Sequence, residues 1–413
     1  MHMSRHLFFL LAIFATLPLM AQRHEIYHER IASLQVMAGD DWLSPPVTML
    51  NGDPINISFD DLTHEYHRYV YRIEHCDADW QTTQGLFTSD YIDGFADGLT
   101  IDDYNESINT NVLYTHYSLS IPNDDCQLKI SGNYKLTVYD ENEDDESMFT
   151  ACFMVSEDAM TLGLSASTNT DLGNNKCYQQ LGMTLGYNSL RVTNPNTQIK
   201  TVILQNGRWD SAIISPKPQY TMSDGLRWEH CRELIFQGGN EYRKFETLDV
   251  NHTTMGLEMM DWDGTDFHAY VTIDEPRPSY VYDESANGSF YIRNSDNVDN
   301  DFISEYVWVH FTLKTEPVNG SIYLNADWTQ DRFLPSYLMV YDPTDGLYHA
   351  TIRLKQGYYS YQYLILRPDG TTALLSSEGN YYQTENQYQV LIYYKGVGER
   401  ADRLVAYQQI QLQ

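Results

Sequence analysis

The stretch EHCDADW, from Glu74 to Trp80, gathers residue types that often do chemistry. A Cys beside a His is typical of a nucleophile with its base, and His, Cys and Asp side chains are common metal ligands. The stretch ends the run HRYVYRIEHC, which begins at His67 and alternates as a strand does. Because successive strand side chains point to opposite faces, we expect His75 and Cys76 to face apart, although either could meet a distant partner.

The same cluster also suits a structural corner. Zinc would need further ligands at close spacing, and none is visible near it. Asp77 and Asp79 stand where short carboxylates commonly accept backbone N–H groups at a strand end, and Trp80 is expected to cover core. We therefore expect a turn or a partner-contact surface here, with a metal site and catalysis as alternatives.

Other motifs for catalysis or cofactor binding are absent from the sequence. HEYH at His64–His67 lacks the spacing of a zinc-protease helix, and no nucleophile elbow, phosphate loop or dinucleotide fingerprint occurs. The acidic run Asp140–Glu146 is expected to be a solvated hairpin tip, with a Ca²⁺ site as the alternative. We predict no catalytic residue, no metal and no cofactor, and we do not expect an enzyme.

A second candidate contact is QNGRWD, from Gln205 to Asp210. Asn-Gly after an apolar run predicts a hairpin turn. Arg208 and Trp209 follow it, and these residue types dominate binding hot spots. The alternative is a Trp that seals one end of a β-sandwich.

Composition and length indicate the elements that must position these residues. The chain has 413 residues, 13% of them aromatic, with 33 Tyr. Short alternating runs separated by turn clusters, without helical periodicity, predict an all-β fold. The length predicts two to three domains. The strand spacing predicts that these are consecutive β-sandwiches of immunoglobulin-like or early-set-like type.

The N-terminus is expected to be a secretory signal peptide. Arg5 precedes an apolar stretch from Leu7 to about Leu19, and a small residue, Ala21, marks the expected cleavage site. The apolar stretch is shorter than the roughly 20 residues that a spanning helix needs. We therefore expect an exported protein, in the periplasm, that is soluble after cleavage.

The formal net charge of −31 makes nucleic acid a poor partner, because an acidic chain repels phosphate. The five cysteines have wide spacings and no CxxC motif. We expect mostly buried free thiols, although their disulfide state stays open.

Domain limits follow the groups of strand-like runs. We expect a signal peptide at 1–21, an N-terminal β-sandwich at 22–158, a middle β domain at 159–312 and a C-terminal early-set-like sandwich at 313–413. GNYKLTVYD and MFTACFMVSE are predicted to form a hairpin across the acidic tip. The final run, DRLVAYQQIQLQ, is predicted to be the last strand of the C-terminal sandwich.

The C-terminal region is similar to the early-set sandwiches that include glycogen-binding modules. The similarity lies in a Trp near a strand end, in GLYHATIRL, and in GYYSYQY followed by PDG. Those modules bind glucan with a surface Trp, and Trp328 could fill that place. An exported carbohydrate-binding β-sandwich protein is therefore the alternative function.

Longer motifs are spread over the mature chain, namely EHCDADW, DYIDGF, ESINTNVLYTHYSLSIPN, KISGNYKLTVYD, CFMVSE, QNGRWD, NEYRKFETLD, LKQGYYSYQYLI and EGNYYQTENQYQVLIYYKGVGERADRLV. In this order they resemble the plug protein family of the type IX secretion system, long catalogued as a domain of unknown function. A departure from the family pattern is Ala401 before Asp402, where an aromatic or basic residue is expected.

This resemblance implies a non-enzymatic function. Plug proteins occlude the periplasmic opening of a very large outer-membrane β-barrel translocon when no substrate is passing. The implied partner is that barrel, with no nucleic acid, no small-molecule substrate and no membrane contact except through the barrel. The residues offered for partner contact are Asp77, Asp79, Trp80, Arg208, Trp209 and Trp328.

Overall fold

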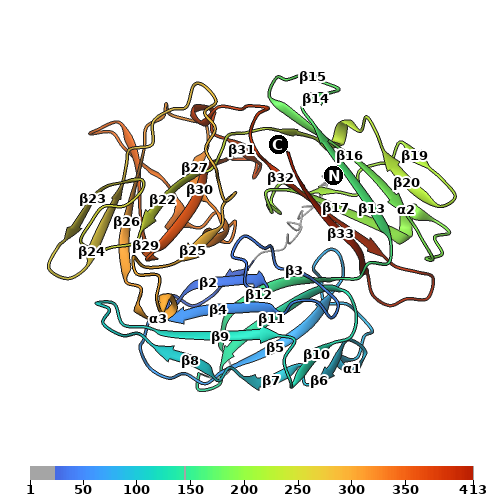
Figure 1. The fold of residues 1–413 in the computed structure, drawn as a ribbon, viewed down its shortest axis with the longest axis horizontal. Helices are drawn as coiled ribbons and strands as arrows, with labels where there is room; N and C mark the ends of the chain where they lie inside the picture. Colours follow the sequence, from blue (N-terminus) through green and yellow to red (C-terminus); the bar gives the residue numbers. More distant parts are fainter. Residues whose placement is uncertain (1–23, 144–145, 413) are drawn as a thin grey trace, which may run out of the picture.

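The computed structural model describes residues 24–143 and 146–412, so the expected signal peptide lies outside the described residues. The fold is all-β, as the alternating runs predicted, and three lobes surround a common centre (Figure 1). We call residues 24–157 the first lobe, 158–238 with 385–412 the second lobe, and 239–384 the third lobe.

The described helices are single turns, and none of them is long or apolar enough to cross a membrane. They are α1 (Thr88–Tyr91), α2 (Pro195–Gln198), α3 (Asn300–Ile303) and the 3₁₀ turns η1 (Arg232–Leu234), η2 (Asp327–Thr329), η3 (Pro335–Tyr337) and η4 (Ser376–Glu378).

The first lobe is a sandwich of two sheets with a small ribbon beside them. The first sheet has the order β1-β12-β11-β5-β7, with β3 on β12, and the second has the order β2-β4-β9-β8. The predicted hairpin across the acidic tip is confirmed, because β11 pairs antiparallel with β12. Buried side chains from both sheets, such as Phe59 and Leu136, form one core.

The strands of this lobe are β1 (Glu25–Ile26), β2 (Ile31–Ala38), β3 (Val47–Met49), β4 (Ile55–Asp61), β5 (Tyr69–Cys76), β6 (Ile92–Gly94), β7 (Asp97–Thr100), β8 (Asp103–Glu106), β9 (Thr115–Ile121), β10 (Cys126–Leu128), β11 (Gly132–Asp140) and β12 (Glu146–Ser156).

The second lobe is built from two distant parts of the chain. One sheet has the order β13-β16-β20-β19 with β21 on β16, and the other has the order β18-β17-β32-β33. Its strands are β13 (Thr161–Ser167), β14 (Asn169–Thr170), β15 (Gly173–Asn174), β16 (Tyr178–Gly186), β17 (Ile199–Gln205), β18 (Ile213–Ile214), β19 (Tyr220–Thr221), β20 (Gly225–Trp228), β21 (Ile235–Gln237), β32 (Gln387–Tyr394) and β33 (Arg403–Gln411).

The third lobe is a second complete sandwich. One sheet carries β22, β25, β27 and β31 around β30, and the other has the order β23-β24-β26-β29-β28. Its strands are β22 (Arg243–Thr247), β23 (Leu257–Trp262), β24 (Phe267–Val271), β25 (Phe290–Ile292), β26 (Tyr306–Leu313), β27 (Ser321–Asn325), β28 (Val340–Asp342), β29 (Leu347–Lys355), β30 (Gly357–Leu366) and β31 (Thr372–Leu374).

The sheets do not follow the expected division at residues 312 and 313. The last two strands are present where the alternation predicted them, but β32 pairs with β17 and β33 pairs with β32. Likewise, β26 and β22 pair with the later strands β29 and β30. The third lobe is therefore inserted into the second, and the final strand does not belong to a C-terminal sandwich.

Candidate functional site

The EHCDADW corner lies at the end of β5. His75 faces the core of the first lobe, where its ring meets Tyr134 edge-on at 5.1 Å. Its Nδ1 lies 2.9 Å from Thr83 Oγ1, and its Nε2 lies 3.2 Å from the Ser131 carbonyl oxygen. Cys76 belongs instead to a cluster between the first and second lobes. The side chains of His75 and Cys76 therefore face apart, as the strand alternation predicted.

Burial also opposes nucleophilic chemistry at this corner. Burial lowers the pKa of His75, so the imidazole is neutral at pH 7. Burial raises the pKa of the Cys76 thiol to about 12. Because the thiolate is the nucleophilic form, Cys76 has the properties of a packing residue.

Asp77 and Asp79 organise the turn that follows β5. Asp79 is exposed, and its Oδ1 accepts the backbone N–H of Gln81 at 3.2 Å. Asp77 Oδ1 accepts the hydroxyl of Thr83 at 3.0 Å. This is the turn role that the sequence suggested for short carboxylates.

Asp77 also joins the first lobe to the second. Its Oδ1 accepts the backbone N–H of Asp402 at 2.9 Å, and Asp402 Oδ2 accepts the backbone N–H of Ala78 at 3.0 Å. Lys200 Nζ lies 2.7 Å from the same Asp402 oxygen. Asp402, the residue beside the noted departure at Ala401, therefore ties the corner to β17 and β33.

Trp80 and Trp209 meet at the centre of this contact. Their rings pack edge to face with centroids 5.6 Å apart, and their exposures are 1% and 7%. Trp80 also holds a left-handed backbone, φ 62°, which is uncommon for a bulky residue. The surrounding buried cluster comprises Cys76, Ala78, Cys152 and Met154 from the first lobe and Val202, Leu204, Leu391, Tyr393 and Leu404 from the second. Trp80 and Trp209 thus anchor a contact inside the chain.

Arg208 lies beside a contact between the second and third lobes. The Asn206–Gly207 turn has positive φ at both residues, 53° and 71°, as the predicted hairpin turn requires. Arg208 donates from two nitrogens to both oxygens of Asp210, at 3.1 and 2.7 Å. The hydroxyl of Thr372, in the third lobe, donates to the same carboxylate at 2.9 Å.

Trp328 is buried in the core of the third lobe, with 5% of its surface exposed. Its Nε1 donates to the Ser360 carbonyl oxygen at 3.0 Å, and its ring meets Tyr359 edge-on at 6.0 Å. A ring enclosed in this way has no free face on which a sugar could stack. The early-set similarity predicted Trp328 on the surface, and the structure places it in the core instead.

Sequence reasoning missed a buried charge network between the first and third lobes. Asp60 Oδ2 accepts from Lys355 Nζ at 2.6 Å and from the Tyr306 hydroxyl at 2.6 Å, and Asp60 Oδ1 lies 2.7 Å from His116 Nδ1. Lys355 Nζ also lies 4.1 Å from the centroid of the Tyr114 ring. The sequence signals are two acidic residues at the end of β4, Asp60 and Asp61, and a Lys at the end of β29, which do not reveal that Asp60 and Lys355 meet.

Burial alone would favour the neutral forms of Asp60 and Lys355. It raises the pKa of Asp60, but Lys355 and His116 outweigh it, and the net pKa lies below its usual value. Burial lowers the pKa of Lys355, and Asp60 offsets part of that change. Since the charged forms stabilise each other, removal of one partner leaves an uncompensated charge in the joint.

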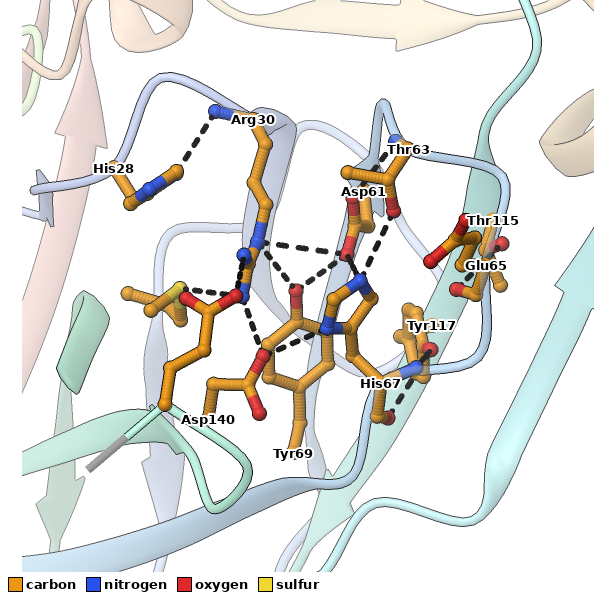
Figure 2. A network of polar contacts seen from close by, with 12 residues as sticks. His28, Arg30, Asp61, Thr63, Glu65, His67, Tyr69, Thr115, Tyr117 and Asp140 are labelled. Atoms are coloured by element: carbon orange, nitrogen blue, oxygen red, sulfur yellow. Dashed lines mark hydrogen bonds and ion pairs between the residues drawn. The ribbon is translucent and has the colours of Figure 1, made fainter. Parts of the chain in front are cut away.

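A second buried network closes one end of the first lobe (Figure 2). Arg30 donates to Asp140, to Glu143 at 2.7 Å and to the Tyr69 hydroxyl at 3.2 Å. His67 Nδ1 lies 2.7 Å from the same Asp140 carboxylate. Asp140, expected in a solvated tip, is instead fully buried because its strand carries it into this network.

The same network contains a possible set of metal ligands. Ligand atoms of His67, Asp140 and Glu143 lie within 4.8 Å of one another. The guanidinium of Arg30 already contacts both carboxylates and supplies positive charge there. The arrangement is therefore satisfied as an ion-pair network.

A cavity of about 730 Å³ lies where the three lobes meet. Gln35 and Trp42 line it from the first lobe, Asn206 and Gln387 from the second, and Asp327 from the third. Trp42 also stacks on Tyr291 with ring centroids 5.6 Å apart, which links the first and third lobes beside the cavity.

Comparison with known proteins identifies a family that matches the first lobe and a solved structure that is similar to the whole fold. Residues 31–157, nearly the whole first lobe, match the family described as "Type 9 secretion system plug protein 1st domain". The whole fold is similar to the crystal structure of a hypothetical protein from Parabacteroides merdae ATCC 43184, with 36% identity and a TM-score of 0.91. That similarity covers 94% of this chain and 99% of the other. No curated protein matches the chain.

The similar crystal structure resembles this chain over all three lobes. The family match concerns the lobe that carries the EHCDADW corner. It connects the chain with type IX secretion, with the machinery of that system and with the cell envelope. The chain belongs to the type IX secretion system plug protein family.

Proposed function

We propose that this protein is a periplasmic plug that occludes the outer-membrane translocon barrel of the type IX secretion system when no substrate is passing. The observation that carries the proposal is the match of residues 31–157 to the type IX secretion system plug protein family, and the buried contacts between the lobes support it. A wide aqueous barrel lumen leaks solutes unless it is closed. A stopper for such a lumen must keep its shape against thermal motion.

Buried contacts at all three boundaries between lobes support a rigid arrangement. Trp80 and Trp209 pack between the first and second lobes. Asp60 and Lys355 pair between the first and third. Thr372 bonds to Asp210 between the third and second. Because each lobe contacts both others, bending at one joint would strain the other two.

The proposal assigns no reaction to the chain. The neutral imidazole of His75 and the high thiol pKa of Cys76 support a structural corner. The burial of Trp328 likewise gives no support to the alternative function of carbohydrate binding.

The test combines permeability with co-purification. Deletion of the gene is expected to increase uptake of vancomycin, which is too large for ordinary porins, and the wild-type gene on a plasmid should reverse the effect. A tagged full chain is expected to recover a large β-barrel from solubilised outer membranes. Unchanged permeability together with a pull-down that contains no barrel would contradict the proposal.

A further inference from the structure

The cavity at the meeting point of the three lobes has a size typical of ligand-binding sites. Its volume of about 730 Å³ lies within the range of roughly 300–1,000 Å³ found for pockets that enclose a ligand. Its walls come from all three lobes, so an occupant would contact each of them.

The charges on its wall have one sign. Glu284, Asp327, Asp331 and Glu385 line the cavity, and its described lining residues include no Lys or Arg. His24 also lines it, but burial lowers the pKa of His24 to about 4, so this ring is neutral at pH 7.

The two Asp side chains at this wall have only neutral hydrogen-bond donors. Asp327 accepts from the Ser289 hydroxyl at 2.9 Å, and Asp331 accepts from the Asn325 amide at 2.7 Å. Among the described residues, no Lys, Arg or His forms an ion pair with either of these carboxylates.

The groups that lie near Asp331 outside the cavity lining do not cancel the negative charge of the lining. Arg208 attracts Asp331 from the second lobe, but its two donating nitrogens are engaged by Asp210. Tyr242 also lies in this group of side chains, and burial raises its pKa, so it stays neutral. The net charge of the wall at pH 8 is therefore negative.

Polar amides and aromatic rings complete the wall. Gln35 and Gln389 carry amides that can both donate and accept hydrogen bonds, as a peptide backbone requires. The Asn206 amide is already engaged, because it donates to Asn386 at 2.7 Å and accepts from the Gln387 N–H at 2.9 Å. Trp42 and Tyr282 offer aromatic faces, which attract ammonium and guanidinium groups. A bare metal ion would use neither feature and would leave most of the volume unfilled.

We propose that this cavity binds a short extended peptide segment that carries Arg or Lys side chains, with Asp327 and Asp331 as the groups that receive the cation. The segment's backbone pairs with the wall amides, and its cationic side chain reaches the two carboxylates. This inference is independent of the proposed plugging function, because it concerns a cavity inside the chain and not the surface that would meet a barrel.

The test uses the full chain and the peptide Ac-Ala-Arg-Ala-Arg-Ala-NH₂ in isothermal titration calorimetry at pH 8. Binding is expected, and the same peptide with Glu in place of both Arg should not bind. The double variant Asp327→Asn/Asp331→Asn is expected to weaken binding at least tenfold. Asn keeps an oxygen for Ser289 and Asn325, and a thermal melt checks that the variant is folded.

The matched control is Asp93→Asn/Asp124→Asn, which removes two exposed carboxylates of the first lobe and should leave the affinity unchanged. Burial with repulsion from Asp210 raises the pKa of Asp331 to about 7, whereas Asp327 is exposed to solvent and stays charged between pH 8 and pH 5.5. Affinity should therefore fall from pH 8 to pH 5.5, and binding at pH 6.5 should release protons.

The following results of the binding experiments would overturn the inference. They are no binding of the Arg peptide, equal binding of the Glu peptide, unchanged affinity in the cavity variant, and spermidine binding as tightly as the Arg peptide. The last would show attraction for any polycation without a peptide site. Maltohexaose that binds and displaces the Arg peptide would identify a sugar as the occupant and would also overturn it.

Discussion

Trp80 and Trp209 pack edge to face, with ring centroids 5.6 Å apart, across the contact between the first and second lobes. One belongs to the corner after β5, and the other follows the turn after β17. The sequence suggested each of these Trp residues as a contact for another protein, but in the structure they contact each other.

Truncation of Trp80 should weaken this contact strongly. Trp80→Ala is expected to lower the free energy of unfolding by about 3–5 kcal/mol, because it leaves a void in a buried apolar cluster. Urea denaturation followed by fluorescence measures the change. Trp262→Ala, at a Trp that is 44% exposed, should cost about 1 kcal/mol or less. Equal losses in the two variants would contradict a central role for Trp80.

The buried ion pair between the first and third lobes gives a prediction about uncompensated charge. Lys355→Met is expected to cost about 3–5 kcal/mol, because Asp60 stays buried without its main counter-charge. The double variant Asp60→Asn/Lys355→Met should recover part of this loss, and thermal unfolding measures both.

An exposed ion pair supplies the control for this experiment. Lys314 lies 3.1 Å from Glu275, and both side chains are more than half exposed, at 56% and 60%. Lys314→Met should change the free energy of unfolding by about 1 kcal/mol or less, because water screens the pair. A double variant at Asp60 and Lys355 that is no more stable than Lys355→Met would argue against charge as the cause.

The cysteines should differ in their rates of alkylation. Cys76 is buried, and burial raises the pKa of its thiol to about 12, whereas Cys177 is half-buried. Iodoacetamide at pH 8 should therefore modify Cys177 well before Cys76, as mass spectrometry of timed samples would show. Both should react at similar rates in 8 M urea. Rapid labelling of Cys76 in the folded protein would contradict its assignment as a packing residue.

The cavity carboxylates predict how stability depends on pH. The usual pKa of Asp is 3.8, and in the folded chain burial and nearby carboxylates raise that of Asp331 to about 7. Between these two values the folded state holds a proton that the unfolded state releases, so this group makes stability fall as pH rises. The penalty is complete above about pH 7 and absent below about pH 4.

Asp331→Asn should therefore raise the melting temperature at pH 8 by a few degrees and change it less at pH 5. Differential scanning calorimetry at the two pH values measures the difference. The control is Asp124→Asn, at an exposed carboxylate, which should shift the melting temperature little at either pH. A lower melting temperature for Asp331→Asn at pH 8 would contradict the repulsion between Asp331, Asp210 and Asp327.

Local pattern was sufficient for the strands and turns. The alternation at His67–Cys76 predicted β5 and the opposite directions of His75 and Cys76. The paired runs around the acidic tip predicted the β11–β12 hairpin, and Asn206–Gly207 predicted a turn with positive φ. Each of these features depends on residues that are close in the sequence, so composition and spacing carry the signal.

Local pattern could not predict which distant segments of the chain pair with each other. Alternation shows which face of a strand is apolar but not which strand lies beside it, so the pairing of β32 with β17 was missed. The same limit applies to Asp140, the last residue of β11. Alternation places it on the buried face with Leu136, but its counter-charge, Arg30, comes from far earlier in the chain.

The sequence by itself determined the all-β class, the main strands, the turn chemistry and, through long motifs, the family. Only the tertiary structure decided that the third lobe is inserted into the second and that Trp80 faces Trp209. It also decided that Asp60 pairs with Lys355 and that carboxylates from the second and third lobes meet at one cavity. The physical reason is that strand formation follows from local side-chain periodicity, whereas burial and electrostatic pairing depend on which segments the completed fold brings together.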